Sequence, residues 1–310
     1  MRGSVRMGRV HVAPVDSPWA DAIRGAVETG GGQHTGIEDA EALIWLEKHA
    51  RGLEDVLHDG IRWVQYRMAG IDALVAAGVI DDRRTSTTAR GIYADSVAEH
   101  SYALILSALN RIQELVRRGR PGPALQGRRL GDLTVAVVGA GGIGTALIRL
   151  LGPSGADIIA VTRSGRSIEG CTRSLPASRL DEVWPIADVV VLAAPSTTAT
   201  DRLIDADVLA RMPQDAVLIN IARGPLVDTD AVLEALRTGR LGAAALDVTD
   251  PEPLPDGHPL WSEPRALITP HSANPGSSQI IRLCALVTEN VQRFIAGDAL
   301  RNTVDLEAGY

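Results

Sequence analysis

Three segments of the chain place a chemically useful side chain just beyond an apolar run. The first, residues 220–228, holds Arg223-Gly224; the second, residues 247–253, holds Glu252 between two prolines; the third, residues 269–273, holds His271 after a proline. An arginine binds a carboxylate through two parallel hydrogen bonds, and imidazole transfers protons near neutral pH. A carboxylate beside an imidazole fixes its tautomer and favours its protonated form. The three segments therefore predict acid–base chemistry on a small carboxylic acid.

Each of these segments also has an ordinary structural interpretation. An Arg-Gly pair is a common turn, a glutamate between prolines is usually a surface loop, and a histidine after a proline often caps a chain segment. The catalytic interpretation is favoured because all three follow apolar strands, where ligands sit in open α/β sheets.

A glycine-rich turn follows the apolar segment 133–138 (LTVAVV). Gly139, Gly141 and Gly144 have the spacing GxGxxG and open a helical pattern. In that context the first glycine permits a tight turn, the second lets a pyrophosphate approach, and the third lets the helix pack on the strand. The helix N-terminus then faces the phosphates. We expect the cofactor contacts to be Gly139, Gly141, Gly142, Ile143 and Gly144; a glycine turn without a ligand is the alternative.

The next predicted strand, 157–161, ends without the acidic residue that binds the ribose hydroxyls of NAD. Thr162, Arg163, Ser164 and Arg166 occupy that corner. A carboxylate would repel a 2′-phosphate, whereas arginine and serine bind one. The sequence therefore favours NADP(H) over NAD(H). The alternative is that the arginines are simply exposed and either cofactor is accepted.

Composition narrows the class of protein. The 310 residues are 45% hydrophobic and 22% charged, with a net charge of −7, which argues against nucleic-acid or anionic-membrane binding. The only lysine, Lys48, lies far from every motif, so a Gly-Lys-Ser/Thr phosphate loop and a Schiff base are excluded. Two cysteines exclude a disulfide framework or a cysteine zinc site and fit a cytoplasmic protein. We expect no metal, and no apolar stretch is long enough for a membrane helix.

Two series of apolar runs alternate with helical patterns along the chain. This alternation predicts an α/β protein with parallel sheets. A loop rich in Gly, Pro and Arg separates the two series. The first series has strands at 9–14, 40–45 and 61–65 and a helix at 18–29. The second has strands at 133–138, 157–161, 188–193, 216–221, 243–247 and 266–268. Long helices are predicted at 96–118 and 276–296.

Taken together, these motifs resemble those of the D-isomer-specific 2-hydroxyacid dehydrogenase family. The motifs that carry the resemblance are GIYADSVAEH at 91–100, VVGAGGIG, PSTTAT at 195–200, NIARGPLVD, LDVTDPEPLP, ITPHSA and the tail NTVDLEAGY. Residues 1–60 match only in pattern. The resemblance implies two Rossmann-like or flavodoxin-like lobes with doubly wound parallel sheets. It implies that a dinucleotide domain, 102–284, is inserted into a substrate domain, 1–101 plus 285–310, and that the protein is a homodimer formed mainly through the dinucleotide domain.

The resemblance also implies roles for individual residues. Arg223 would bind the substrate, Glu252 would pair with the histidine, and His271 would be the acid/base. Asp247 would contact the nicotinamide carboxamide. Further cofactor contacts would be Pro195, Thr197, Thr200, Ile221 and Ala222. The backbone amides at Met68, Ala69 and Gly70 would hold the substrate carboxylate.

The expected activity is hydride transfer between NAD(P)H and a small 2-keto acid such as glyoxylate or hydroxypyruvate. The cofactor corner is similar to that of NADPH-dependent glyoxylate/hydroxypyruvate reductases. Formate dehydrogenases of the family have glutamine where this chain has Glu252, which argues against formate. Two alternatives remain. One is a non-catalytic nucleotide-sensing scaffold or corepressor of the same fold. The other is an enzyme for a phosphorylated or phosphite-like anion that uses Arg67, whose ordinary interpretation is a surface arginine.

Overall fold

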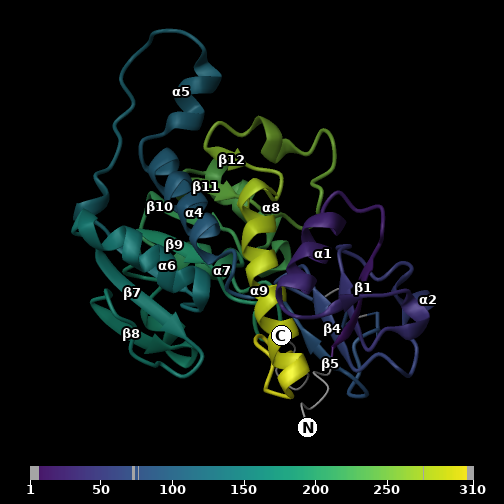
Figure 1. Cartoon of the computed structure of the whole chain (residues 1–310). Helices are drawn as coiled ribbons and strands as arrows, with labels where there is room; N and C mark the ends of the chain where they lie inside the picture. Colours follow the sequence, from purple (N-terminus) through teal and green to yellow (C-terminus); the bar gives the residue numbers. More distant parts are fainter. Residues whose placement is uncertain (1–6, 72–73, 76, 275, 306–310) are drawn as a thin grey trace. The chain divides into compact units, whose positions relative to one another are not determined.

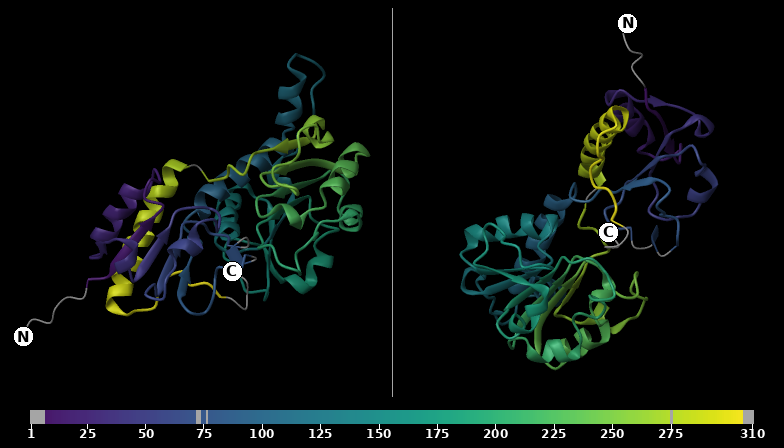
Figure 2. Two further views of the ribbon diagram at one scale, coloured as in Figure 1. Left: turned by 90° about the vertical axis from the view of Figure 1, so that its right-hand side faces the viewer. Right: turned by 90° about the horizontal axis from the view of Figure 1, so that it is seen from below.

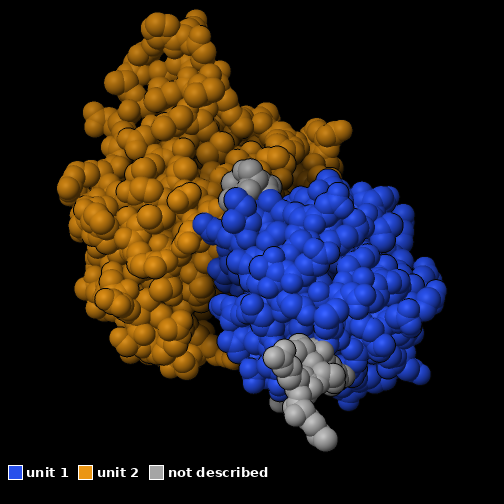
Figure 3. All heavy atoms as spheres, viewed as in Figure 1, with its two compact units in different colours: residues 1–93, 275–310 blue, residues 94–274 orange. Residues whose placement is uncertain are grey.

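The chain folds into two compact units, and the second is inserted into the first (Figure 3). The structure, a computed structural model, describes residues 7–71, 74–75, 77–274 and 276–305. Unit 1 comprises residues 1–93 and 275–310, and unit 2 comprises residues 94–274. The division falls just before helix α4 (Ala94–Leu109) and just before helix α9 (Gly276–Ala296). The predicted domain limits, 101/102 and 284/285, lie inside these two helices instead, because a long uninterrupted helix gives no signal of where its packing partners change.

Unit 1 is built on a parallel sheet of five strands in the order β2-β1-β3-β4-β5. The strands are β1 (Arg9–Ala13), β2 (Gln33–His34), β3 (Ala42–Trp45), β4 (Trp63–Tyr66) and β5 (Thr85–Thr87). Every residue of β3 and β4 is buried, as expected for a sheet covered on both faces. Helix α1 (Ala20–Thr29) packs on β1 and β2 and lies alongside α9 (Figures 1 and 2). The short elements are η1 (Ile37–Asp39) and α2 (Leu53–Val56).

Unit 2 is built on a parallel sheet of seven strands in the order β12-β11-β10-β9-β6-β7-β8. The order reverses at β6, which places the switch point of a doubly wound sheet beside that strand. The strands are β6 (Thr134–Val138), β7 (Asp157–Thr162), β8 (Arg173–Pro176), β9 (Val189–Leu192), β10 (Ala216–Asn220), β11 (Leu241–Leu246) and β12 (Ala266–Ile268). The helices are α4, α5 (Ile112–Arg118), α6 (Gly142–Leu151), α7 (Ala206–Arg211) and α8 (Thr229–Arg237). The short 3₁₀ elements are η2 (Leu130–Asp132), η3 (Gly152–Ser154), η4 (Ala177–Glu182), η5 (Gly224–Leu226) and η6 (Pro259–Ser262). Helices α4 and α6 pack on each other, and α8 packs on β11.

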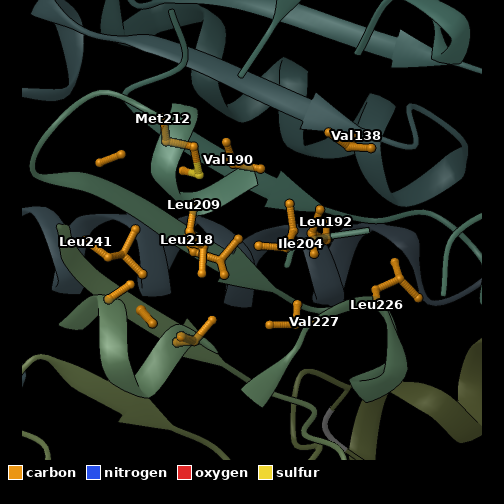
Figure 4. Close-up of a cluster of buried hydrophobic side chains, with 14 of the residues drawn as sticks. Val138, Val190, Leu192, Ile204, Leu209, Met212, Leu218, Leu226, Val227 and Leu241 are labelled. Carbon is orange, nitrogen blue, oxygen red and sulfur yellow. The ribbon is translucent and has the colours of Figure 1, made fainter. Parts of the chain in front are cut away.

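A continuous apolar core fixes the strand ends of unit 2 (Figure 4). Val190, Leu192 and Leu218 of β9 and β10 are fully buried, and Leu209 and Leu226 from the flanking segments pack with them. Burying a side chain of this size contributes about 1.5–3 kcal/mol. The polar residues that follow each strand are therefore carried on rigid supports.

Most predicted elements agree with the structure to within a few residues, and β12 and α9 coincide with their predictions. The single helix predicted at 96–118 is wrong, because the chain forms α4 and α5 with a break between them. At the break Arg111 adopts a left-handed conformation with φ 56°, and its Nε donates to Glu114 at 2.9 Å. Strands β2, β5 and β8 were not predicted; with two, three and four residues they are too short to show a period.

The longest described helix, α9, carries charged residues such as Arg282, Glu289 and Arg293. Among the described helices none has the length and apolar character needed to cross a membrane.

Candidate active site

The glycine-rich turn lies between β6 and α6 and is shaped by close packing. Gly139 has φ 98°, and a Cβ there would lie 2.4 Å from the Ala194 backbone nitrogen. A Cβ on Gly144 would lie 2.6 Å from the Gly139 carbonyl oxygen, so helix and strand meet at backbone distance. Gly141 faces open space, since a Cβ there would meet no atom within 4 Å among the described residues. Because the first amides of a helix have no acceptor within it, the turn fits a phosphate group.

The corner after β7 brings a guanidinium to that turn. Arg166 Nη2 donates to the Ala140 carbonyl oxygen at 2.8 Å. Arg163 and Ser164 are exposed beside it. No acidic residue occurs between Thr162 and Ile168, so nothing in this segment repels a 2′-phosphate.

The segment after β9, which contains Pro195, Thr197 and Thr200, is closed by its own hydroxyl groups. Thr200 Oγ1 donates to the Pro195 carbonyl oxygen at 2.7 Å and accepts from the Thr197 amide at 2.8 Å. In this loop Pro195 is exposed and Thr197 is half-buried. Thr200, predicted as a cofactor contact, therefore uses its hydroxyl group to hold the conformation of this loop.

Arg223 is carried on a loop that a buried amide holds. The Asn220 side chain is fully buried; its Oδ1 accepts from the Ala222 amide at 3.0 Å and its Nδ2 donates to the Arg223 carbonyl at 2.9 Å. A Cβ on Gly224 would lie 1.8 Å from the Thr249 carbonyl oxygen, so only glycine fits there. The half-buried Arg223 donates from Nη1 to the Ala222 carbonyl at 2.7 Å. Ile221 and Ala222 are both buried.

His271 and Glu252 form a close pair. His271 Nδ1 lies 2.7 Å from Glu252 Oε1, and the two side chains are 53% and 42% exposed. An ion pair with this exposure adds at most about 1 kcal/mol to stability. Because a carboxylate only accepts, Nδ1 carries the proton, and Nε2 is the ring nitrogen that remains for a substrate. The sequence predicted this pairing of side chains.

Asp247 fixes the backbone of the loop that carries His271. Its Oδ1 accepts from Thr269 Oγ1 at 2.6 Å and from the Ser272 amide at 2.9 Å, while Oδ2 accepts from the Ala273 amide at 3.2 Å. The His271 amide donates to the Asp247 carbonyl at 2.8 Å.

Burial alone would raise the pKa of the Asp247 carboxyl, but hydrogen bonds from His100, Thr269, Ser272 and Ala273 outweigh it and hold the pKa at about 2. The Asp247 side chain is only 1% exposed, and its hydrogen bonds hold the loop that carries His271. Its contact with a nicotinamide carboxamide remains a prediction.

Helix α4 supplies two side chains to the same loop that the sequence did not single out. His100 Nε2 lies 3.2 Å from Thr269 Oγ1 and 3.4 Å from Asp247 Oδ1, and Ser96 Oγ donates to Asn274 Oδ1 at 3.0 Å. The spacing of four places Ser96 and His100 on one helical face, which is the signal that could have identified them. Since Thr269 donates its hydroxyl proton to Asp247, His100 Nε2 is the donor.

A cavity of about 230 Å³ adjoins the His271–Glu252 pair within unit 2. Its walls include the apolar side chains of Leu254, Trp261 and Ile268. The Trp261 indole donates to the Pro255 carbonyl at 3.1 Å, which holds that wall in place.

The predicted carboxylate loop, Met68 to Gly70, belongs to unit 1, whereas the other site residues belong to unit 2. It follows β4 after one intervening residue, Arg67. The Met68 carbonyl accepts from the Ala89 amide at 2.8 Å, and the exposed Ala69 and the half-buried Gly70 come next.

The comparisons with known proteins identify the family. The family described as "D-isomer specific 2-hydroxyacid dehydrogenase, NAD binding domain" matches residues 102–273. An uncharacterized protein of Corynebacterium melassecola is 40% identical over 92% of this chain and 95% of its own length. A glyoxylate reductase of Thermofilum pendens is 33% identical over 67% of this chain, which spans 64% of that relative.

Solved structures agree over nearly the whole chain. A D-isomer specific 2-hydroxyacid dehydrogenase from Xanthobacter autotrophicus Py2, in complex with NADPH and MES, superposes with a TM-score of 0.84 at 28% identity, covering 98% of this chain and 99% of that one. An NADPH-dependent glyoxylate/hydroxypyruvate reductase from Sinorhizobium meliloti, in complex with NADP and sulfate, gives a TM-score of 0.82 at 25% identity, covering 98% and 100%. The resemblance and the fold class predicted from the sequence are confirmed. The chain belongs to the D-isomer specific 2-hydroxyacid dehydrogenase family and is an NAD(P)-dependent oxidoreductase of that kind.

Proposed function

We propose that the protein reduces a small 2-keto acid to the D-2-hydroxy acid, with His271 as the proton donor. The observation that carries this proposal is the 2.7 Å contact between His271 Nδ1 and Glu252, on a loop anchored by the buried Asp247. Glyoxylate and hydroxypyruvate are the first substrates to consider, because relatives and neighbours carry these names.

The cofactor would supply the hydride, and the residues of the chain would place and protonate the substrate. His271 Nε2–H donates to the keto oxygen as negative charge develops there. Glu252 accepts the hydrogen bond from Nδ1–H and so leaves Nε2 directed to the substrate. Arg223 binds the carboxylate, and the backbone amides at Met68, Ala69 and Gly70 hold the same group.

For the cofactor we favour NADP(H), with NAD(H) as the alternative. The support is the absence of an acidic residue after β7 and the guanidinium of Arg166 at the glycine turn. The remaining proposed contacts are Gly139, Gly141, Gly142, Ile143, Gly144, Arg163, Ser164, Pro195, Thr197, Thr200, Ile221, Ala222 and Asp247. Ser164→Asp would place a carboxylate at the 2′-phosphate, so kcat/KM for NADPH should fall at least about 10-fold while that for NADH rises or stays constant.

We also propose that the protein is a homodimer of the cytoplasm. Helix α5 exposes Ile112, Leu115 and Val116, the last at 71%, and the loop that follows it extends away from the sheet of unit 2 (Figure 1). A second copy would bury this apolar face. Val116→Glu should convert the dimer to a monomer by light scattering. The two free cysteines suit a reducing compartment.

The decisive experiment measures initial rates of NADPH and NADH oxidation with glyoxylate, hydroxypyruvate, pyruvate, phenylpyruvate and 2-ketoisocaproate. Turnover that His271→Ala abolishes without weakening cofactor binding supports the proposal. Cofactor binding without turnover on any keto acid would contradict it and favour the nucleotide-sensing scaffold instead.

A further inference from the structure

The carboxyl edge of the unit 1 sheet holds an arginine that the proposed mechanism does not use. In the strand order β2-β1-β3-β4-β5, the direction of winding changes between β1 and β3. Ligands of open α/β sheets bind beyond the carboxyl ends of the strands at such a point. The segment after β1 contributes Trp19 to this edge, and the segment after β4 contributes Arg67.

The Arg67 guanidinium is fixed in place by an aromatic ring. Its carbon Cζ lies 4.5 Å from the centroid of the Trp19 ring, and both residues are half-buried. A stacked guanidinium keeps its N–H groups directed outward from its edge, so it can still bind an oxyanion in two-pronged fashion. Trp19 therefore positions a cation and leaves its donors available.

Within the described residues, no carboxylate or carbonyl accepts a hydrogen bond from the Arg67 guanidinium. Several other arginines of unit 1 form ion pairs. Those with a carboxylate partner are Arg9 and Arg62 on Glu41, Arg24 on Asp21, Arg83 and Arg84 on Asp81, and Arg293 and Arg301 on Glu289. A half-buried guanidinium that donates to no oxygen among the described residues is unusual, since burial of a charge is costly unless it is paired.

The backbone around Arg67 is also held. The Arg67 amide donates to the Trp45 carbonyl at 3.1 Å, and Tyr93 Oη donates to the Arg67 carbonyl at 2.7 Å. Burial raises the pKa of Tyr93 to about 12, although the nearby Arg67 guanidinium opposes this, so the hydroxyl keeps its proton. The residue is thus preorganised, directly before the loop Met68 to Gly70 that we assign to the substrate carboxylate.

The charges of the neighbouring segment after β3 are compatible with an anion. Lys48 is exposed there, and Arg51 is exposed two residues before α2. The carboxylate of the segment, Glu47, pairs with His49 at 3.6 Å. The segment between β3 and α2 therefore carries two exposed cations and one carboxylate, whereas the segment after β1 carries the exposed Asp16.

We infer that Arg67, held on the Trp19 ring, binds a second anionic group of the substrate, so that the preferred 2-keto acids carry a carboxylate or a phosphate-type group beyond the keto-acid end. This inference rests on the proposed function, because the first carboxylate is assigned to the adjacent loop. It adds no chemical step and defines the substrate class.

The test uses matched pairs of keto acids that differ only in the distal group. 2-Oxobutanoate and oxaloacetate exchange a methyl for a carboxylate, 2-oxopentanoate and 2-oxoglutarate do so one methylene further out, and hydroxypyruvate and phosphohydroxypyruvate exchange a hydroxyl for a phosphate. For the full-length wild-type enzyme, kcat/KM should be about 10- to 100-fold higher for at least one dianion than for its partner. The pair with the largest ratio distinguishes a carboxylate from a phosphate.

Arg67→Gln should remove that preference, lowering kcat/KM for the dianion about 10- to 100-fold and leaving the monoanion within about threefold. Arg67→Lys should restore part of the loss, because the charge returns without the planar fork. Trp19→Leu should weaken the preference several-fold, and Trp19→Phe should retain most of it. Arg83→Gln is the matched control, since it removes the same charge before β5, at the opposite edge of the sheet.

Three results would overturn the inference. In Arg67→Gln, kcat/KM could fall equally for both members of a pair, or not fall at all. In the third case, the wild-type enzyme prefers the monoanions. In each case the proposed reductase function still stands. If the wild type reduces no keto acid, the proposed function fails separately, and thermal shifts with succinate and butyrate decide the site. Succinate should then raise the Tm of the wild type more than that of Arg67→Gln, and an equal shift in both would refute the inference.

Discussion

Two loops of unit 2 are each anchored by one buried polar side chain, but by different chemistry. The loop of Arg223 is held by the Asn220 amide, which accepts one hydrogen bond and donates another. The loop of His271 is held by the Asp247 carboxylate, on which a hydroxyl and two amides converge. A carboxylate can only accept, so it gathers a loop by attracting donors, and its hold depends on charge. The comparison teaches that the support of the proton-transfer residue responds to pH, while that of the arginine does not.

The largest expected effect comes from removing what the two loops carry. His271→Asn should lower kcat for keto-acid reduction about 10²- to 10⁴-fold, because the general acid is lost, with cofactor affinity unchanged. Arg223→Gln should lower kcat/KM about 10²-fold, with a clear rise in KM, because a charge-assisted contact to the carboxylate is lost. Steady-state kinetics and cofactor titration distinguish the two. If His271→Asn raised only KM, the assignment of proton donor and anchor would be wrong.

Exchanging the chemistry of the two anchors tests the comparison through stability. Asp247→Asn turns an amide nitrogen toward the donors of the loop, and Asn220→Asp turns a carboxylate oxygen toward the Arg223 carbonyl. Each should lower the free energy of unfolding at pH 7 by about 2–3 kcal/mol, measured by urea denaturation. Asp230→Asn, at an exposed position in α8, is a control that should change it by less than about 0.5 kcal/mol. An unchanged free energy of unfolding in Asp247→Asn would show that the loop keeps its conformation without the carboxylate.

The two anchors should differ in pH dependence. The pKa of Asp247 is lowered from 3.8 to about 2 by its hydrogen bonds, so the carboxylate stabilises the folded state above its ordinary pKa by about 2 kcal/mol. That stabilisation is lost as the pH falls from about 5 toward 2, so the wild type and Asp247→Asn should converge there. In Asn220→Asp the introduced carboxyl must be protonated to donate, so this variant should instead lose stability as the pH rises from about 4. If the free energy of unfolding of Asp247→Asn and of Asn220→Asp depended on pH in the same way, the proposed difference between the two anchors would be wrong.

The smallest expected effect concerns the outer support of the carboxylate. His100→Leu removes the donor that reaches Thr269 and Asp247, and kcat should fall about three- to tenfold with KM nearly constant. Ser96→Ala lies on the same face of α4 but contacts Asn274, so its kcat should stay within about twofold. A larger effect for Ser96→Ala would mean that the packing of α4, and not the carboxylate, determines the position of His271.

The sequence predicted the parts of the molecule in which local pattern and final geometry coincide. Parallel strands buried on both faces read as apolar runs, and the residues just beyond them, such as Arg223 and His271, form the site because strand ends share an edge. Glycines with a steric task, such as Gly139, were equally readable from their spacing.

What the sequence did not reveal depends on contacts between distant segments. The contacts of His100 and the stacking of Arg67 on Trp19 become visible only when segments from different strands and helices meet. The break at Arg111 was hidden because neither glycine nor proline marks it in the sequence. The limits of the two units were hidden for the related reason that α4 and α9 continue across the predicted limits without interruption.

The single lysine has a practical consequence. Lys48 is exposed on the segment that follows β3, at the carboxyl edge of the unit 1 sheet. Apart from the α-amino group, an amine-reactive fluorophore has one attachment point on the chain. The dye would report on the electrostatic environment of this edge, without any engineered cysteine and without disturbing the arginines that carry nearly all of the positive charge.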